Sequence, residues 1–144
     1  MNEKINYLTP DICIKEHDKL IKKIGGRYGI MDLGILDSLL DHIKNDIYYP
    51  SFESKVSRLV FSIAKFHVFM DGNKRTSIAI GALFLNINDY GYCSDTFIDE
   101  MENIVLMVVQ NIISEDLLLE IITSIIENDE ISYEVKLKIS RINI

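Results

Sequence analysis

The segment His67-Val68-Phe69-Met70-Asp71-Gly72-Asn73-Lys74-Arg75-Thr76 leads into a long apolar stretch that runs to Asn88. Because this stretch is apolar on almost every side, it predicts a helix that other helices surround. The residues Asn88-Asp89-Tyr90-Gly91 then supply the polar and glycine positions that end a helix. We therefore expect a central helix from about Lys74 to Asn88, entered through a polar loop.

The segments on either side of the central helix also repeat apolar residues at helical spacing. Thr9-Pro10-Asp11 predicts the start of a first helix, because a hydroxyl side chain caps free N–H groups and proline suits the first turn. Gly25-Gly26 predicts its end. Asp32 can cap a second helix that stops near Tyr48-Tyr49-Pro50. Further helices are expected over about residues 52–66, over about 96–112, and from a Ser114 cap to near Glu127. The sequence thus predicts a mainly α protein, a compact bundle of about six helices.

Two segments depart from the helical pattern. Residues 25–31 contain three glycines and are expected to form a turn or a flexible loop. The tail carries apolar residues at alternate positions, which favours a short C-terminal strand; they are Ile131, Tyr133, Val135, Leu137 and Ile139. The same tail also permits a helix through Ile131, Val135, Ile139 and Ile142. No repeat or linker divides residues 1–144, so a single domain is expected.

The composition fits a folded protein that stays out of the membrane. Hydrophobic residues make up 48% of the 144 residues, enough to bury a core in one domain. The net charge of −7 argues against direct nucleic-acid binding, which depends on lysine and arginine neutralising phosphates. Residues 1–6 carry no apolar signal-peptide core, and the longest apolar runs are too short to cross a bilayer. Cys13 and Cys93 show no metal-ligand spacing and are interpreted as reduced thiols in a cytoplasmic protein.

The loop before the central helix combines residue types that bind phosphate. Gly72 lets the backbone adopt a positive φ or come close to a ligand. The residues after it begin a helix, where free N–H groups and the helix dipole attract anions. Lys74 and Arg75 add two cations, and Asp71 offers a hard oxygen ligand for Mg²⁺, which usually binds through carboxylates and phosphates. This combination predicts a phosphate site that includes a metal ion.

His67 is the side chain of the loop that titrates near neutral pH, which suits a general base that takes a proton from a hydroxyl nucleophile. Phe69 is expected to point into the core and hold the loop in place. Each residue has an ordinary explanation alone, since helix-end histidines often cap or pack and Asp-Gly-Asn is a common turn. Two cations at a helix N-terminus, however, cost about 0.3–1 kcal/mol each unless an anion binds there. Their convergence in one loop favours a functional site, although not a P-loop, whose glycine–lysine spacing is absent.

The loop resembles the His-x-Phe-x-Asp-x-Asn-Lys-Arg signature of the Doc (death-on-curing) toxins, a branch of the Fic superfamily. Every specified position matches, through His67, Phe69, Asp71, Asn73, Lys74 and Arg75. The resemblance extends from about Tyr7 to Ile126 and includes His17-Asp18, Gly25-Gly26 and the stretch from Gly29 to Gly34. It implies a core of about residues 7–127, with residues 128–144 as an extra C-terminal tail.

The resemblance implies a fold, an activity and a partner. The fold is a compact helical bundle with a short flap near the active site, for which residues from about Tyr28 to Ser51 are the candidates. The activity is that of a toxin that uses ATP to phosphorylate a threonine of elongation factor Tu and thereby blocks translation. The partner is an antitoxin of the prevents-host-death type, whose C-terminal segment lies in a groove of the toxin.

The resemblance also implies a role for each loop residue. His67 is the expected base, while Asp71 orients the site and holds Mg²⁺. The expected phosphate-binding residues are Gly72, Asn73, Lys74 and Arg75. Lys65 stands where some Doc proteins carry arginine and is a further candidate for nucleotide contact, although a solvated lysine is the simpler interpretation.

Most Fic proteins instead transfer AMP and carry His-Pro-Phe-x-x-Gly-Asn-Gly-Arg-x-x-Arg. Here Lys74 replaces the glycine before the first arginine, and Ile78 replaces the second arginine. A lysine side chain fills space where glycine lets a pyrophosphate lie against the backbone, and one phosphate-binding cation is missing. Both changes favour phosphate transfer. Gly72 is closer to the general Fic pattern, so AMP or NMP transfer is the alternative activity.

Two other interpretations remain at this point. A non-enzymatic binding module could keep the loop while acting through a partner. Thr123-Ser124-Ile125-Ile126-Glu127-Asn128 also fits the [Ser/Thr]-x-x-x-Glu-[Gly/Asn] string of self-inhibited Fic proteins. Ile78 removes the second arginine that such a glutamate usually blocks, which weighs against self-inhibition.

Overall fold

The computed structural model describes residues 4–142, which form seven α-helices and one short 3-10 helix and contain no β-sheet. In chain order the elements are α1 (Pro10–Ile24), α2 (Leu33–His42), α3 (Phe52–Lys65), α4 (Asn73–Asn86), η1 (Gly91–Cys93), α5 (Ser94–Val109), α6 (Glu115–Asn128) and α7 (Tyr133–Ile142). The mainly α class predicted from the sequence is confirmed.

Helix α4 begins differently from most of its neighbours. Side-chain oxygens cap α1, α2, α3 and α6 by accepting backbone N–H groups; the capping residues are Thr9, Asp32, Ser51 and Ser114. Helix α4 instead begins after Gly72, in the left-handed conformation with φ 73°, and no side chain caps it. Because the first N–H groups of a helix have no intrahelical partner, α4 presents them without a side-chain acceptor.

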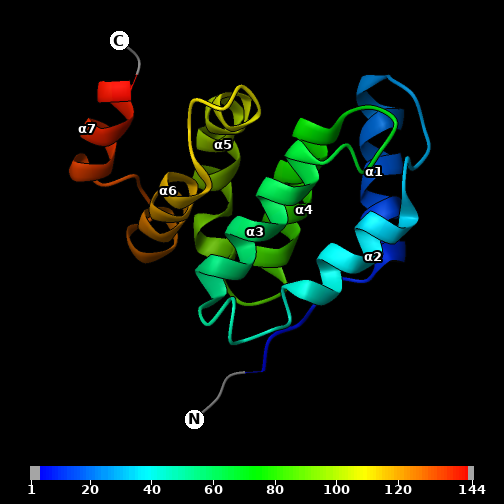
Figure 1. Cartoon of the computed structure of the whole chain (residues 1–144), viewed down its shortest axis with the longest axis horizontal. Coiled ribbons are helices and arrows are strands. Elements are labelled where there is room, and N and C mark those ends of the chain that lie inside the picture. Colours follow the sequence, from blue (N-terminus) through cyan, green and yellow to red (C-terminus); the bar gives the residue numbers. More distant parts are fainter. Residues whose placement is uncertain (1–3, 143–144) are drawn as a thin grey trace.

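Helix α4 lies in the middle of the bundle and packs against α1, α3 and α5 (Figure 1). Its buried residues lie on several faces, as the all-round apolar pattern predicts. Gly81 permits the closest approach, because an added Cβ would lie 2.8 Å from the Phe97 ring and 2.9 Å from Val60. This packing fixes the start of α4, and therefore the polar loop before it, against the neighbouring helices.

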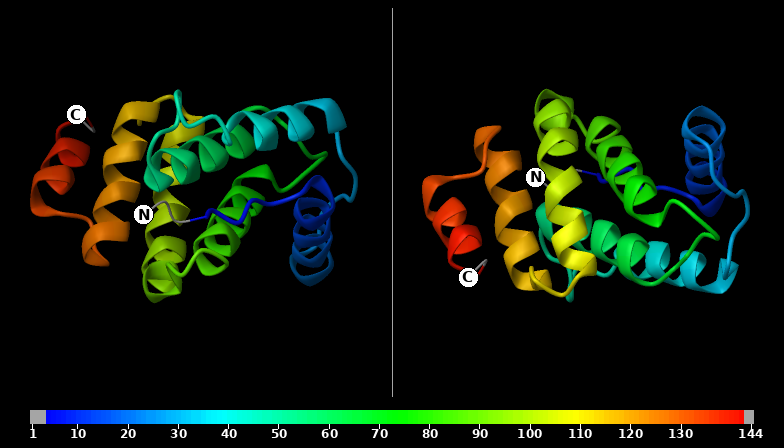
Figure 2. Two further views of the ribbon diagram at one scale, coloured as in Figure 1. Left: turned by 90° about the horizontal axis from the view of Figure 1, so that it is seen from below. Right: turned by 90° about the horizontal axis from the view of Figure 1, so that it is seen from above.

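Helix α1 lies at one end of the molecule, and α6 and α7 lie at the other (Figures 1 and 2). The connection between α3 and α4 reaches α1, where the side chain of His17 contacts the backbone of Asp71. The string from Thr123 to Asn128 forms the C-terminal half of α6, at the end of the molecule away from α1. Its position gives no support to self-inhibition of the loop.

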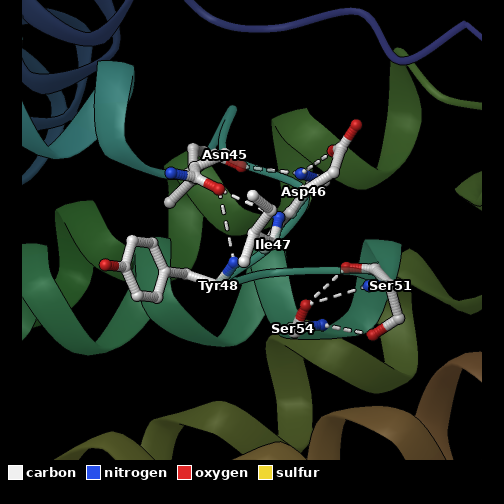
Figure 3. Close-up of polar contacts among 8 residues, drawn as sticks. Asn45, Asp46, Ile47, Tyr48, Ser51 and Ser54 are labelled. Atoms are coloured by element: carbon white, nitrogen blue, oxygen red, sulfur yellow. Dashed lines mark hydrogen bonds and ion pairs between the residues drawn. The ribbon is translucent and has the colours of Figure 1, made fainter.

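The connection between α2 and α3 is held by local hydrogen bonds (Figure 3). Asn45 Oδ1 accepts the backbone N–H groups of Ile47 and Tyr48, at 2.9 and 3.3 Å. The buried Lys55 of α3 donates from Nζ to the Ile43 carbonyl and pairs with Asp46, each at 2.8 Å. A buried lysine needs such partners, because an unpaired charge away from water is costly. The connection is therefore anchored to α3, the helix that leads into the polar loop.

The C-terminal tail is a helix, so the predicted short strand is wrong. Residues Tyr133–Ile142 form α7, which packs against α6. The buried Ile131 and Val135 and the partly buried Ile139 are spaced four residues apart, and they pack against the core. The other two alternate apolar residues lie off this spacing: Tyr133 is exposed and Leu137 is only partly buried. Packing on α6 decides between the two patterns that the same residues allow.

The sequence predicts reduced cysteines and no membrane span. Cys13 and Cys93 are buried and unpaired. Burial raises the pKa of the Cys13 thiol to about 12, which keeps it protonated and unreactive at neutral pH. Over residues 4–142, none of the helices combines the length and the apolar character that a membrane span requires.

Candidate active site

The polar loop occupies the sharp connection between α3 and α4. Helix α3 ends at Lys65, and His67 turns the chain with a φ of 51°, which is uncommon for a residue other than glycine. Val68 and Phe69 are buried, whereas His67 and Met70 are exposed. Phe69 is only 1% exposed, as expected for a ring that holds the loop in the core. The loop thus has an apolar anchor and keeps its polar side chains near the surface.

The side chain of Asn73 bonds both backbone groups of Phe69. Asn73 Oδ1 accepts the Phe69 N–H at 2.9 Å, and Asn73 Nδ2 donates to the Phe69 carbonyl at 2.9 Å. These two hydrogen bonds link the end of the loop, at Asn73, back to Phe69. Phosphate binding by the Asn73 side chain stays a prediction, while its observed contacts give it a structural role.

Asp71 connects the loop to the segment that follows α1. Its Oδ2 accepts the backbone N–H of Arg27 at 3.0 Å, and its Oδ1 accepts the N–H of Gly72 at 2.9 Å. These two hydrogen bonds hold the pKa of the Asp71 carboxyl below its usual value. Gly26 permits the approach, because an added Cβ there would lie 2.8 Å from Asp71 Oδ2. The carboxylate is therefore ionised and fixed in direction.

The glycine-rich segment of residues 25–32 lies along the loop. The Met31 N–H donates to the Val68 carbonyl at 2.8 Å, and the Met70 N–H donates to the Gly29 carbonyl at 3.0 Å. Ile30 and Phe69 form an isolated antiparallel bridge. The flap expected within residues 28–51 stays a prediction; in that range, residues 29–31 contact the loop and Leu33–His42 is helical.

His17 of α1 contacts the loop, a contact that the sequence allows but does not favour over a half-buried position on the helix. Its Nε2 lies 2.7 Å from the Asp71 carbonyl oxygen, and its ring stacks on Phe69 with centroids 4.2 Å apart. The side chain is 1% exposed. Its spacing of four residues from Cys13 and Ile21, which are also buried, was the available signal that His17 faces inward.

Lys74 and Arg75 are exposed in the first turn of α4, and neither forms an ion pair with any residue in 4–142. A cavity of about 780 Å³ opens beside them, between α1, α4 and α5. Lys23 adds a third cation to its lining, and Ile78 and Leu106 contribute apolar walls. Two free cations and uncapped N–H groups thus border an open cavity, which is an arrangement suited to an anion with an apolar part.

The structure separates Lys65 from this group. Its Nζ hydrogen-bonds to the side chain of Asn111, at the connection between α5 and α6, and lies 5.4 Å from the centre of the Phe61 ring. His67, in contrast, makes no hydrogen bond with any residue that the structure describes, and its imidazole is exposed. Nucleotide contact by Lys65 stays a prediction without a structural contact that favours it.

The residues present suit a magnesium ion that is carried mainly by a nucleotide. No group of three or more histidine, cysteine, aspartate or glutamate side chains converges among the described residues. Mg²⁺ commonly binds through one or two carboxylates together with substrate phosphates. The ionised Asp71 carboxylate, beside the start of α4, supplies one such oxygen donor.

Comparison with known proteins assigns the chain to a family. A sequence model of the Fic/DOC family matches residues 7–85, more than half of the chain. The chain belongs to the Fic/DOC family. The matched region covers α1, the connection to α2, α2, α3 and most of α4. It therefore includes His17 and the whole polar loop from His67 to Arg75.

Two curated relatives match more than half of the chain. Toxin Doc of Mycolicibacterium smegmatis is 33% identical over 84 residues, which are 56% of this chain and 65% of that protein. Protein kinase doc of Escherichia phage P1 is 31% identical over 88 residues, which are 58% of this chain and 69% of that protein. The chain thus spans about two thirds of the length of each relative.

Proposed function

We propose that this Fic/DOC protein is the toxin of a toxin–antitoxin system and transfers the terminal phosphate of ATP to a hydroxyl group of a protein. The observation that carries the proposal is the pair of unpaired cations, Lys74 and Arg75, on an uncapped helix start that directly follows the His67 loop. The names of the two relatives, a toxin and a protein kinase, support the same activity.

The nucleotide binds with its phosphates at the start of α4. The uncapped N–H groups there and the two cations neutralise phosphate oxygens, and Arg75 offers a planar fork that suits them. The cavity beside Lys74 and Arg75 has apolar walls that accept the nucleoside part. A bound phosphate also removes the repulsion between two adjacent cations and the helix dipole.

His67 acts as the general base of the transfer. Its neutral imidazole takes the proton of the acceptor hydroxyl while the hydroxyl oxygen bonds to the terminal phosphorus of ATP. The bond from that phosphorus to the bridging oxygen breaks, and ADP leaves. Mg²⁺, held by the Asp71 carboxylate together with the phosphates, supplies charge neutralisation when it is bound.

Phosphate transfer fits this site better than AMP transfer, which is the alternative. Lys74 occupies the position where AMP-transferring Fic proteins carry glycine, and a lysine side chain fills space that a glycine would leave open for a pyrophosphate against the backbone. Ile78 replaces the second arginine and forms part of the apolar wall of the cavity. Both replacements favour an orientation in which the terminal phosphate faces the acceptor.

The proposed target is a threonine of elongation factor Tu, and the proposed effect is a block of translation in the cytoplasm. The proposed partner is an antitoxin of the prevents-host-death type, whose C-terminal segment would inhibit the toxin by lying in a groove of its surface.

Incubation with purified elongation factor Tu and either γ-labelled or α-labelled ATP tests the activity. We expect γ-label on the target and none with His67→Ala, while the matched variant His42→Ala keeps wild-type transfer.

Two results would contradict the proposal. Incorporation of α-label, together with the mass of a whole nucleotide on the modified protein, would establish AMP transfer instead. If expression of His67→Ala stopped growth as strongly as the wild type, the chain would act as a binding module without catalysis. Toxicity that a co-expressed antitoxin relieves, and that His67→Ala removes, is the expected outcome.

A further inference from the structure

The peptide group between Asp71 and Gly72 is fixed from both of its polar ends. Its carbonyl oxygen lies 2.7 Å from His17 Nε2, and its N–H donates to the Asp71 carboxylate at 2.9 Å. A carbonyl can only accept, so His17 Nε2 carries the hydrogen and donates it. This peptide group leads into Gly72, the residue before the first residue of α4, and it sets the orientation with which the helix begins.

A peptide group next to glycine is the one most easily reversed. Gly72 has a φ of 73°, in a region that glycine enters and leaves at little steric cost. Reversal of the Asp71–Gly72 peptide would exchange the directions of its N–H and its C=O. The N–H would then leave Asp71 Oδ1, and the carbonyl oxygen would take its place beside the carboxylate. Asp71 would lose one of the two N–H donors that fix its direction.

The donor on His17 is itself held in one direction. Its imidazole is 1% exposed and lies nearly parallel to the Phe69 ring, at an interplanar angle of 8° and a centroid distance of 4.2 Å. Its other ring nitrogen, Nδ1, lies 3.8 Å from Asp18 Oδ1. The backbone N–H and C=O of Phe69 are in turn hydrogen-bonded to the side-chain amide of Asn73. His17, Phe69 and Asn73 therefore form one connected support beneath Asp71.

We propose that His17 is a positioning residue, which holds the Asp71–Gly72 peptide and thereby fixes the phosphate-binding start of α4 and the Asp71 carboxylate. The inference rests on the proposed function, because phosphate binding gives the peptide its purpose. His17 contacts neither the phosphates nor the acceptor in this role. It acts through the Asp71 backbone alone.

Two substitutions separate the hydrogen bond of His17 from its packing. His17→Phe keeps a ring on Phe69 and removes the donor, whereas His17→Gln keeps a donor near the Nε2 position and removes the ring. His42→Phe makes the same exchange at an exposed histidine of α2 and serves as the control. The affinity for MgATP is measured by calorimetry, and the hydrogen exchange of the Gly72 amide is measured by NMR.

We expect His17→Phe to bind MgATP about 10- to 100-fold more weakly, the range found for second partners of metal-site ligands. The protection of the Gly72 amide should fall in the same variant, while its melting temperature falls less than that of His17→Gln, which also loses the ring. His17→Gln should restore affinity and amide protection, although the loss of the ring lowers its melting temperature. In transfer assays, the loss in His17→Phe should reside in kcat and in the KM for ATP, leaving the KM for the protein acceptor unchanged.

Wild-type MgATP affinity and wild-type Gly72 protection in His17→Phe would overturn the inference. Losses in both variants that follow their melting temperatures would overturn it as well, because packing alone would explain them. If His17→Phe does not fold, His17→Gln decides, since a tenfold loss of affinity in that variant contradicts a role for the donor. The binding and exchange measurements need no turnover. A wild-type protein that binds MgATP without transferring phosphate would therefore contradict the proposed function, while the two His17 variants would still test the inference.

Discussion

The side-chain amide of Asn73 closes the polar loop by accepting the N–H of Phe69 and donating to its carbonyl, each at 2.9 Å. Both backbone groups belong to a residue that is almost fully buried, where water is a poor substitute. The first residue of α4 thus holds the residue that anchors the loop in the core. This contact ties the stability of the loop to the helix start that the phosphates would use.

Asn73→Ala should therefore destabilise the protein. It leaves the N–H and the C=O of Phe69 without a partner, at a cost of about 1–3 kcal/mol in unfolding free energy for each group that finds no replacement. Urea denaturation measures the loss. Asn86→Ala is the matched control, since Asn86 is exposed at the other end of α4. Equal stabilities of the Asn73→Ala variant and the wild type would show that the amide does not support the loop.

Phe69→Ala should lower the unfolding free energy by about 3–5 kcal/mol, the usual cost of emptying a buried phenylalanine site. The ring is 1% exposed and also loses its stacking with His17. Phe66→Ala provides the comparison, because the side chain of Phe66 is 42% exposed and should cost clearly less. An unchanged melting curve for Phe69→Ala would contradict the burial of this ring.

Lys74→Glu should separate stability from function. A carboxylate in the first turn of α4 favours the helix dipole, so the ligand-free variant should gain about 0.3–1 kcal/mol in unfolding free energy. The same change removes a charged hydrogen-bond donor and adds repulsion, so MgATP affinity should fall on the order of 10- to 100-fold. Lys15→Glu, an exposed exchange in the middle of α1, should change neither quantity appreciably. A Lys74→Glu variant that keeps wild-type affinity would remove Lys74 from the phosphate site.

The stability contribution of Asp71 should depend on pH in a defined direction. The N–H groups of Arg27 and Gly72 lower the folded-state pKa of this carboxyl below the ordinary 3.8. Its stabilising effect is therefore full above about pH 4 and is lost as the pH falls through the lower folded-state pKa. The difference in unfolding free energy between wild type and Asp71→Asn should shrink between pH 5 and pH 2.5 in urea titrations. Asp37→Asn, at an exposed position of α2, controls for general acid effects, and a difference that grows toward low pH would reverse the assignment.

The sequence predicts those parts of the fold that local chemistry determines. Thr9, Asp32 and Ser114 cap helices because a short oxygen side chain satisfies an N–H three residues on, a relation visible without the fold. The strand predicted for the tail is wrong because a strand period of two and a helical spacing of four share Ile131, Val135 and Ile139. Only packing on α6 distinguishes the strand from the helix. The local pattern at this position carries no information about that neighbour.

The candidate site divides in the same way. The residues of the loop could be named from the sequence because they are contiguous and chemically distinctive, and in the structure hydrogen bonds link Asp71 to Gly72 and Asn73 to Phe69. His17 joins them across 54 positions of sequence, through a contact that depends on how α1 packs against α4. Lys65 turns instead to Asn111, 46 positions away. Contacts at such separations are set by tertiary packing, which residue type and spacing do not determine.

The contact between α6 and α7 allows a test of the tail that leaves the site alone. The buried hydroxyl of Ser124 donates to the Glu130 carbonyl at 3.0 Å and accepts the Ser132 N–H at 2.6 Å, so it holds the turn between the two helices. Ser124→Ala leaves both groups to solvent or unpaired and should destabilise the docking of α7 by about 1–3 kcal/mol. Hydrogen exchange should then show α7 opening below the global unfolding free energy. Transfer activity should stay at the wild-type level, because α7 lies at the end of the molecule away from α1 (Figure 2). Loss of transfer in a folded Ser124→Ala protein would instead show that the tail communicates with the loop, and unchanged exchange in α7 would show that Ser124 does not hold it.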